Sequence, residues 1–339
     1  MKAAVFYKKE DLRVEELPIP IIKKDEVLVR VRACGVCGTD VHIFSGDEGA
    51  APTPAGTVLG HEFAGEIVEV GADVKGYAVG DIVSVDPNKL CGECEFCRGG
   101  LGHFCTAMRG IGTTEHGGFA EYCAAPVSQL CKYPAGTPFE AAAMTEPVSC
   151  CLHGIDLCNI KPGVAVAVIG CGMIGLLMLQ LAKLSGAGTL IAIEPLADKR
   201  EKALELGADY ALDPMSCDVN AEVAKITHQV DVVIECVGKT STMQQAVEIA
   251  GVYSTVMLFG LTSPDAKMEI KPFQLFKKEI VLKASFITPY TFPRALALIQ
   301  SGKIDVNSMV CKVAPPEELV EILTDPALRA KGKYLISCI

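Results

Sequence analysis

A glycine-rich turn between an apolar strand and an apolar helix constrains this chain more than any other feature. Residues 164–169 are mostly β-branched, residues 170–175 read Gly-Cys-Gly-Met-Ile-Gly, and residues 174–182 form an apolar run typical of a buried helix. An acidic residue, Glu194, follows 19 positions after Gly175. Glycines at this spacing let backbone N–H groups approach a pyrophosphate at a helix N-terminus, and the carboxylate can bind a ribose. The pattern therefore predicts a dinucleotide-binding unit, with an ordinary strand–helix turn as the alternative.

The residues expected to contact the dinucleotide belong to the turn and to the segment after the second strand. They are Gly170, Gly172, Met173, Ile174, Gly175, Glu194, Lys199 and Arg200. Lys199 and Arg200 could tolerate a 2′-phosphate on the ribose. A carboxylate at the ribose repels such a phosphate, so Glu194 favours NAD over NADP.

Predicted strands and helices alternate from about residue 161 onward. Strands are expected at 164–169, 189–193, 230–235, 254–259 and 280–285, and helices at 174–182, 198–206, 241–250 and 292–301. Nearly unbroken apolar strands in such an alternation predict a parallel sheet with helices on both faces. The first 150 residues are β-rich instead, because residues 26–33, 66–70 and 81–85 alternate like half-buried strands. A chain of 339 residues has room for two domains, and residues from 304 on are expected to return to the first.

Composition and charge exclude several classes of protein. Half of the residues are hydrophobic and 21% are charged, which excludes a disordered chain. The net charge of −10, with no long basic block, argues against nucleic acid or an anionic membrane surface as a partner. Residues 163–182 lack charges, but the glycine turn interrupts them and argues against a membrane helix. The sixteen cysteines and the lack of a signal-like N-terminus predict a reducing compartment, and so the cytoplasm.

Four cysteines lie close together in the sequence Cys91-x2-Cys94-x2-Cys97-x7-Cys105. Four thiolates on one short loop can surround a tetrahedral zinc ion, which predicts a structural zinc site. An iron–sulfur cluster fits the last spacing poorly, and two disulfides are the other alternative. We expect His103 to be an exposed loop residue rather than a ligand. A site with four thiolate ligands has no open position, so it would stabilise a lobe without catalysing a reaction.

A second set of possible metal ligands is dispersed along the chain. It consists of Cys37, His61, Glu62 and Glu146. One thiolate, one imidazole and carboxylates from different segments are typical of a catalytic zinc ion, and Co or Mn could occupy such a site too. The spacing of isolated residues alone does not establish the site. Cys34 and Cys37 also form a C-x-x-C pattern, but the βαβ surroundings of a thiol redox motif are missing.

Taken together, these motifs resemble the zinc-dependent medium-chain alcohol dehydrogenases over essentially the whole chain. The resemblance rests on Gly60-His61-Glu62-Phe63-Ala64-Gly65-x5-Gly71-x2-Val74, on Cys37-Gly38-Thr39-Asp40-Val41-His42, on the four-cysteine lobe, on residues 117–122 and on the nucleotide pattern. The polyol (sorbitol-type), threonine and sugar-alcohol dehydrogenases are the most similar branch, because Glu146-Pro147 stands where that branch has Glu-Pro. The resemblance implies an α/β fold: a GroES-like β-rich catalytic domain at 1–150 with a structural zinc lobe at 88–108, a Rossmann domain with a doubly wound parallel sheet at 151–290, and a C-terminal return to the catalytic domain at 291–339.

The resemblance also implies a role for each residue of the second set and of its neighbours. Cys37 and His61 would be zinc ligands, and Glu62 and Glu146 would be the carboxylates that complete or exchange at the site. Asp40 would fix the tautomer of His61. Thr39 would bind the substrate hydroxyl and His42 would pass the proton outward, whereas Phe119 and Ile287 are expected to contact the substrate.

The implied activity is reversible oxidation of a secondary alcohol by NAD, with two zinc ions per chain in a homodimer or homotetramer. The substrate would be a polyol, a vicinal diol or a sugar alcohol, with or without a phosphate. Sorbitol-type enzymes usually have a Phe-Arg-Tyr run where residues 285–290 read Ser-Phe-Ile-Thr-Pro-Tyr, and the missing Arg argues against sorbitol itself. L-Threonine 3-dehydrogenase activity and a non-catalytic zinc- and nucleotide-binding protein are the alternatives. The second would be expected to have lost at least one residue of the catalytic set.

Overall fold

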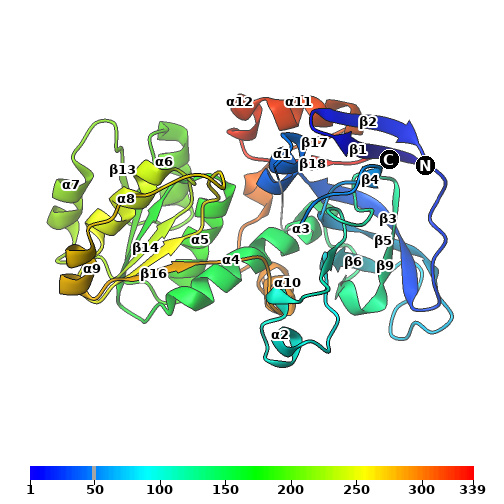
Figure 1. Ribbon diagram of the computed structural model, residues 1–339, viewed down its shortest axis with the longest axis horizontal. Coiled ribbons are helices and arrows are strands. Elements are labelled where there is room, and N and C mark those ends of the chain that lie inside the picture. The colour runs from blue at the N-terminus through cyan, green and yellow to red at the C-terminus, as the bar shows by residue number, and fades with distance from the viewer. Residues whose placement is uncertain (48–50) are drawn as a thin grey trace. The chain divides into compact units, whose positions relative to one another are not determined.

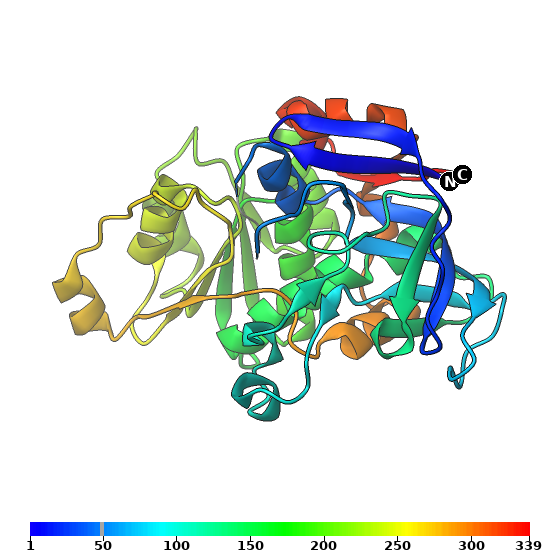
Figure 2. The same cartoon turned by 45° about the vertical axis from the view of Figure 1, so that its right-hand side comes forward.

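The computed structural model describes residues 1–47 and 51–339. The described chain divides into two units (Figure 1). Unit 1 comprises Met1–Ser149 and Thr288–Ile339, and unit 2 comprises Cys150–Ile287. Unit 1 is thus built from two separate stretches of chain. Its N- and C-terminal ends lie side by side in both views (Figures 1 and 2).

Unit 1 consists mainly of β-strands. They are β1 (Lys2–Lys8), β2 (Asp11–Glu16), β3 (Glu26–Gly35), β4 (Thr57–Val58), β5 (Glu62–Val70), β6 (Ile82–Val85), β7 (Asn88–Lys89), β8 (Arg109–Gly110), β9 (Tyr122–Pro126), β10 (Leu130–Tyr133), β17 (Val310–Ala314) and β18 (Lys333–Ile336). The largest sheet has the order β10-β6-β5-β3-β18-β17, and β9 pairs with β3 as well. The C-terminal strands β17 and β18 therefore belong to the same sheet as strands from the first hundred residues.

Short helices lie between and after these strands. They are α1 (Gly38–Phe44), α2 (Glu95–Arg98), α3 (Phe139–Ala143), α10 (Phe292–Gln300), α11 (Leu319–Thr324) and α12 (Pro326–Arg329), with 3-10 turns at Gly102–Phe104, Val127–Gln129, Asn307–Met309 and Pro316–Glu318. Helix α4 (Thr145–Cys158) contains the boundary between the units.

Strand β3 is central to unit 1 because it pairs with β5, β9 and β18. Its valines Val27, Val29 and Val31 are fully buried, as the alternation of polar and apolar residues predicts. At its C-terminal end, Gly35 is paired with Glu62 of β5 and with Leu335 of β18. Three distant segments of the chain therefore meet at the end of this strand.

Unit 2 contains a six-stranded parallel sheet of the order β13-β12-β11-β14-β15-β16. The strands are β11 (Ala165–Ile169), β12 (Thr189–Ile193), β13 (Tyr210–Leu212), β14 (Val232–Glu235), β15 (Thr255–Leu258) and β16 (Val281–Ala284). The helices are α5 (Met173–Leu184), α6 (Ala197–Glu205), α7 (Val219–Ile226), α8 (Thr240–Ile249) and α9 (Pro272–Lys278). Helices lie on both sides of the sheet (Figure 2). This strand order is that of a doubly wound dinucleotide-binding fold, and the order reverses between β11 and β14.

The sequence located five of the six strands of unit 2 to within about two residues. Strand β13 and helices α7 and α9 were not predicted. The uncharged run at 163–182 is divided among β11, the glycine turn and α5. Across residues 1–47 and 51–339, no helix combines the length and the hydropathy needed to cross a membrane.

The structure gives a different account of glycine at each of the three positions of the turn. Gly170 has a φ of +88°, in the left-handed region that favours glycine. A Cβ on Gly175 would lie 1.8 Å from the carbonyl oxygen of Gly170, so helix α5 packs against the turn only if this residue is glycine. A Cβ on Gly172 would have nothing within 4 Å. Packing thus explains Gly175, whereas Gly172 leaves space beside the N-terminus of α5.

We expect Gly175→Ala to destabilise the protein by about 1–3 kcal/mol, because the added methyl group overlaps a backbone oxygen. The matched variant Gly172→Ala should cost less, about 0.5–1 kcal/mol, because its side chain meets open space and only the poorer N-cap of α5 weakens the protein. If Gly172 leaves room for a pyrophosphate, both variants should bind NAD more weakly. Denaturant unfolding and titration with NAD measure these effects. Equal stability of Gly175→Ala and the unmodified protein would contradict the packing argument.

Candidate metal centres and nucleotide site

Helix α1 carries several of the predicted site residues. Cys37 is its N-cap, and the carboxylate of Asp40 accepts a hydrogen bond of 2.9 Å from the backbone N–H of Cys37. Asp40 is fully buried, whereas Thr39 and His42 are partly exposed. Thr39 and His42 lie three residues apart and so occupy the same side of the helix. One short helix therefore presents a buried carboxylate on one side and a hydroxyl and an imidazole on another.

Cys37, His61 and Glu62 come together at the end of β3. Their possible ligand atoms all lie within 4.8 Å of one another. The pairing of β3 with β5 produces this arrangement, because His61 directly precedes β5 and Glu62 opens it. One thiolate, one imidazole and one carboxylate are a donor set that suits zinc. The structure thus brings together three of the four residues predicted for a catalytic metal.

Asp40 is placed to orient the ring of His61. One of its carboxylate oxygens, Oδ1, lies 3.5 Å from Nδ1 of His61. Burial lowers the pKa of His61, but the charges of Asp40 and Cys37 outweigh burial and raise this pKa well above 6.5. A metal ion would therefore have to displace a proton from His61 on binding. Binding through Nε2 would leave Nδ1 facing Asp40, the arrangement by which a carboxylate fixes a metal-binding histidine.

Glu146, the fourth predicted residue, is buried in the first turn of α4 but is not among the atoms grouped within 4.8 Å. Its neighbour Thr145 fixes the start of the helix. The Thr145 hydroxyl donates to the carbonyl oxygen of Ala142 at 2.6 Å and lies 2.7 Å from the Tyr133 hydroxyl. In this structure Glu62 is the carboxylate that joins Cys37 and His61.

Sequence reasoning missed a buried cation beside this group. Lys333, the first residue of β18, forms an ion pair with Glu62 and donates a hydrogen bond of 2.9 Å to the carbonyl oxygen of Val36. Burial lowers the pKa of Lys333, but the charges of Glu62, Cys37 and Glu146 raise it overall above 10.5. Lys333 therefore stays charged at neutral pH. No motif surrounds it in the sequence, and only the pairing of β18 with β3 shows where it lies.

Thr39 and His42 could carry a proton away from the buried group. The Thr39 hydroxyl lies 3.8 Å from the sulfur of Cys37, and Nδ1 of His42 lies 3.3 Å from a carboxylate oxygen of Asp47. Both His42 and Asp47 are partly exposed to solvent. Asp47 was not predicted, because a lone acid after a short helix has no distinguishing pattern. The acid gives His42 a hydrogen-bonding partner near the protein surface.

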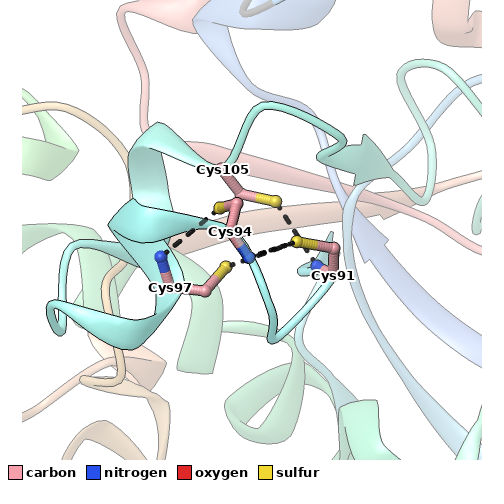
Figure 3. A group of neighbouring side chains, drawn as sticks. All are labelled: Cys91, Cys94, Cys97 and Cys105. Atoms are coloured by element: carbon pink, nitrogen blue, oxygen red, sulfur yellow. Dashed lines mark hydrogen bonds between the residues drawn. The ribbon is translucent and has the colours of Figure 1, made fainter.

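Four cysteines form the second candidate metal centre, and their sulfur atoms lie within 4.8 Å of one another. The sulfurs of Cys91 and Cys97 are 3.9 Å apart. A tetrahedral zinc ion with bonds of about 2.3 Å would separate its ligand sulfurs by about 3.8 Å, so the spacing fits a single zinc ion. Backbone N–H groups of Cys91, Cys94 and Cys97 donate to neighbouring sulfurs, of Cys105, Cys91 and Cys94 respectively (Figure 3).

These backbone hydrogen bonds favour thiolates, the form that binds metal. Those from Cys97 and Thr106 lower the pKa of Cys94 to about 6. The four cysteines are free thiols in the structure, which disfavours the disulfide alternative. His103 is buried, contrary to the expected exposure, and its ring lies tilted against that of Phe104 with 4.1 Å between the ring centroids. Cys105, not His103, is grouped with the other three cysteines.

The structure disfavours a redox role for the C-x-x-C pattern. Cys34 lies within β3 and is fully buried, and burial raises its pKa well above 9.0. A reactive thiol needs a low pKa and access to solvent. Cys34 instead packs against the loop of Gly60, where a Cβ would lie 2.6 Å from the Cys34 sulfur.

The two residues predicted to contact substrate lie in different surroundings. Phe119 is fully buried in the core of unit 1, and a Cβ on Gly60 would come within 2.8 Å of its ring. Ile287 is half-buried and has a φ of +43°. Core packing by itself accounts for Phe119.

In unit 2, Glu194 follows β12 and lies beside the glycine turn. Its carboxylate accepts hydrogen bonds from the backbone N–H of Cys171 at 2.8 Å and of Leu196 at 3.0 Å. The Arg200 guanidinium donates to the carbonyl oxygens of Glu194 and Pro195 and forms an ion pair with Asp213. Arg200 is therefore already held by three acceptors, so its charge is less available to a 2′-phosphate. Lys199 is half-buried, and Met173 and Ile174 open helix α5.

Sequence reasoning also missed Glu235, a fully buried carboxylate at the end of β14. One of its oxygens accepts hydrogen bonds from the backbone N–H groups of Val237 and Gly238 and from the Thr242 hydroxyl. It thereby fixes the loop after β14, next to the point where the strand order reverses. A Glu that ends an apolar strand could have signalled such a role.

Comparison with known proteins agrees with this arrangement. Residues 23–135 match the family model of the alcohol dehydrogenase GroES-like domain, and residues 174–301 match that of zinc-binding dehydrogenases. The chain is 35% identical to D-arabinitol dehydrogenase 1 of Uromyces fabae, over 97% of this chain and 95% of that protein. It is 37% identical to a sorbitol dehydrogenase of Halalkalibacterium halodurans, over 88% and 87% of the two chains.

Two further relatives bear on substrate and cofactor. An L-threonine 3-dehydrogenase of Pyrococcus abyssi is 36% identical, over 87% of this chain and 86% of that protein. A crystal structure of a zinc-binding dehydrogenase from Sinorhizobium meliloti, bound to NADP, superposes with a TM-score of 0.94 at 38% identity and covers 99% and 98% of the two chains. Family models that match both units, together with relatives this similar over almost the full length, establish that the chain belongs to the zinc-dependent medium-chain alcohol dehydrogenase family.

Proposed function

We propose that this protein oxidises a secondary alcohol of the polyol, diol or sugar-alcohol class reversibly to a ketone, with zinc and NAD as cofactors. The observation that carries the proposal is the grouping of Cys37, His61 and Glu62 within 4.8 Å, with the Thr39 hydroxyl beside the Cys37 sulfur. A metal-binding group next to a hydroxyl that can both accept and donate a proton suits oxidation of an alcohol. The four-cysteine centre offers four thiolates to one metal ion and so leaves no open position for a substrate, which suits a role in stability.

Each cofactor would supply chemistry that side chains lack. A zinc ion held by Cys37, His61 and a carboxylate acts as a Lewis acid that lowers the pKa of an alcohol. NAD at the glycine turn accepts a hydride. The protein's own contribution is to hold His61 in one orientation through Asp40, and to accept and remove a proton through Thr39 and His42.

The proton path follows helix α1. The Thr39 hydroxyl accepts the proton of the substrate alcohol while it donates its own proton onward. His42, on the same side of the helix and partly exposed, releases a proton to solvent with Asp47 as its hydrogen-bonding partner. Imidazole suits this step because its ordinary pKa of about 6.5 lies near neutrality.

The substrate class rests on the relatives. Identities to the D-arabinitol and L-threonine enzymes are 35% and 36%, so similarity alone does not separate the two activities. Glu146-Pro147 is typical of the branch that contains both activities, and the run at 285–290 argues against sorbitol itself. We place alditols, vicinal diols and phosphorylated alditols first and L-threonine second, because the D-arabinitol enzyme matches 97% of this chain and the L-threonine enzyme 87%.

We also propose a homodimer or homotetramer in the cytoplasm. Strand β16 lies at the edge of its sheet and is partly exposed, and Phe273 and Phe276 on the nearby helix α9 are 73% and 78% exposed. An exposed strand edge with aromatic side chains beside it favours contact with a second copy of the chain. The sixteen cysteines form no disulfide within the part of the chain that the structure describes, which is consistent with a reducing compartment.

The function is tested with the purified protein, NAD and a panel of alditols, diols, phosphorylated alditols and L-threonine, by following the absorbance of reduced nicotinamide. We expect about two zinc ions per chain and activity with at least one secondary alcohol of the first three groups. Mild chelation should abolish activity while about one zinc ion remains and the fold survives, because the four-thiolate site is closed. Active protein with one metal ion or none would contradict the two-site assignment, and activity with L-threonine alone would favour the alternative.

Cofactor preference should depend on Glu194. We expect NAD to be preferred over NADP by at least about tenfold in kcat/KM, roughly 1.4 kcal/mol, because the carboxylate repels a 2′-phosphate. Glu194→Gln removes the charge but keeps an acceptor for only one of the N–H groups of Cys171 and Leu196, because these two groups bond different carboxylate oxygens. It should therefore narrow the preference for NAD at a cost in stability of about 1 kcal/mol. Glu194→Ala should narrow the preference for NAD over NADP mainly by weakening the binding of NAD. Equal use of NADP by the unmodified protein would mean that Lys199 outweighs Glu194.

Removal of the Thr39 hydroxyl should interrupt the proton path at its first link. We expect Thr39→Val to lose about 10²-fold or more in kcat, whereas Thr39→Ser should keep most of the activity. His42→Ala should lose only about tenfold, with most of the loss at low pH and partial rescue by imidazole buffers, because water can replace the last link. Zinc content and NAD affinity serve as controls and should not change. Near-normal kcat of Thr39→Val would show that the proton leaves by another route.

A further inference from the structure

Lys333 is a buried cation that the proposed reaction leaves without a role. It is 3% exposed, and its partner Glu62 is 1% exposed. Removing a lysine and a carboxylate from water costs several kcal/mol per ion unless each finds a well-placed partner, so such a pair forms only where the fold provides for it. Here the ammonium contacts Oε2 of Glu62 and donates a hydrogen bond to the carbonyl oxygen of Val36. Both contacts lie at the metal-binding end of β3.

The fold leaves space for this ion pair at a single glycine. Gly35 is paired with Glu62 on one side and with Leu335 on the other. A Cβ on Gly35 would lie 2.0 Å from Oε2 of Glu62 and 2.7 Å from Cε of Lys333. The ion pair therefore occupies the volume that any other side chain at position 35 would fill. Lys333 is held over this site by β18, a strand from the far end of the sequence.

The carboxylate of Glu62 can therefore interact both with a metal ion held by Cys37 and His61 and with the ammonium of Lys333. Its ligand atom lies within 4.8 Å of those of Cys37 and His61, and the same carboxylate is paired with Lys333. A carboxylate that shares its charge with an ammonium is a weaker ligand than one without such a partner.

Building on the catalytic metal site proposed above, we propose that Lys333 is a positioning residue that holds Glu62 back from the metal. Its pull keeps the bond between Glu62 and the metal weak, so that Glu62 gives way when a substrate oxygen needs its position. Without Lys333, the metal would be the remaining partner for a buried carboxylate. The metal would then bind more tightly and exchange more slowly.

A purely structural role makes the opposite prediction. If Lys333 only neutralises Glu62 and keeps the end of β3 folded, its removal should loosen the site and speed the loss of metal. The rate at which zinc leaves the protein therefore separates the two roles, and it does so without any measurement of activity. It also shows separately whether a metal occupies the Cys37 site at all.

The experiment measures transfer of zinc from the full-length, zinc-loaded protein to a chelator in Lys333→Met and the unmodified protein. We expect the faster-leaving zinc to depart about tenfold or more slowly from Lys333→Met. The difference in melting temperature between zinc-loaded and zinc-depleted protein should also widen, because Glu62 then depends on the metal for charge compensation. Substitution with Co²⁺ should show an altered visible spectrum in Lys333→Met, because the carboxylate stays bound. Release as fast as, or faster than, from the unmodified protein would overturn the proposal.

Two further variants keep the test decisive. Lys333→Met combined with Glu62→Gln should release zinc as fast as Glu62→Gln alone, since Lys333 would act only through that carboxylate. If Lys333→Met fails to fold, the rate of zinc release from Glu62→Gln decides between the two roles. Release less than about tenfold faster than from the unmodified protein supports the proposal that Lys333 holds Glu62 back from the metal, and a larger increase overturns it. Lys283→Met is the matched control, because Lys283 donates to the carbonyl oxygen of Leu157 at 2.7 Å in unit 2. If the unmodified, zinc-loaded protein releases no faster-leaving zinc ion, that result would contradict the proposed metal site itself, not the role of Lys333.

Discussion

The antiparallel pairing of β3 with β5, extended by β18, is the interaction on which the chemistry of unit 1 depends. It places Gly35 opposite Glu62 and next to Leu335, so that His61, Glu62 and Lys333 meet where β3 ends. The chain then turns at Cys37 into α1, which brings the thiol, Asp40 and Thr39 to the same place. A slip of one residue in this register would move Glu62 to the opposite face of the sheet. The metal-binding group is therefore a consequence of strand register rather than of any single loop.

Charge compensation is the second constraint at this site. Buried anions are costly unless each has a partner, and the structure provides partners of different kinds. Asp40 accepts from a backbone N–H and faces His61, whereas Glu62 faces Lys333. The four-cysteine centre uses backbone N–H groups for the same purpose. Backbone N–H groups and a hydroxyl serve the fully buried carboxylate of Glu235, whereas the carboxylate of Glu62 is paired with a full positive charge.

A feature could be predicted from the sequence when the residues that form it lie within one short segment. The glycine turn, the four cysteines and most strands of unit 2 are encoded within short segments, so their spacing or periodicity reveals them. The residues of the catalytic group were inferred only through resemblance to a family, because their spacing carries no signal. Lys333, Asp47 and Glu235 escaped prediction for the same reason, since each acquires its meaning from a partner fixed by tertiary structure. The burial of His103 was not predicted either, because the spacing of residues in a loop carries no information about their exposure.

The two candidate metal centres differ in the same way, because one takes its ligands from a single segment and the other from distant segments. The four cysteines span 15 consecutive positions, so a metal ion can organise them with little help from the rest of the unit. Cys37, His61 and Glu62 are held instead by a sheet whose strands come from both ends of the chain. A site assembled by a rigid sheet can keep ligands in place even when one of them is shared with a neighbouring cation. Under the proposed role of Lys333, such a sheet would hold Cys37 and His61 firmly on a metal and Glu62 only weakly, which is what a metal needs if it is to accept and release a substrate oxygen.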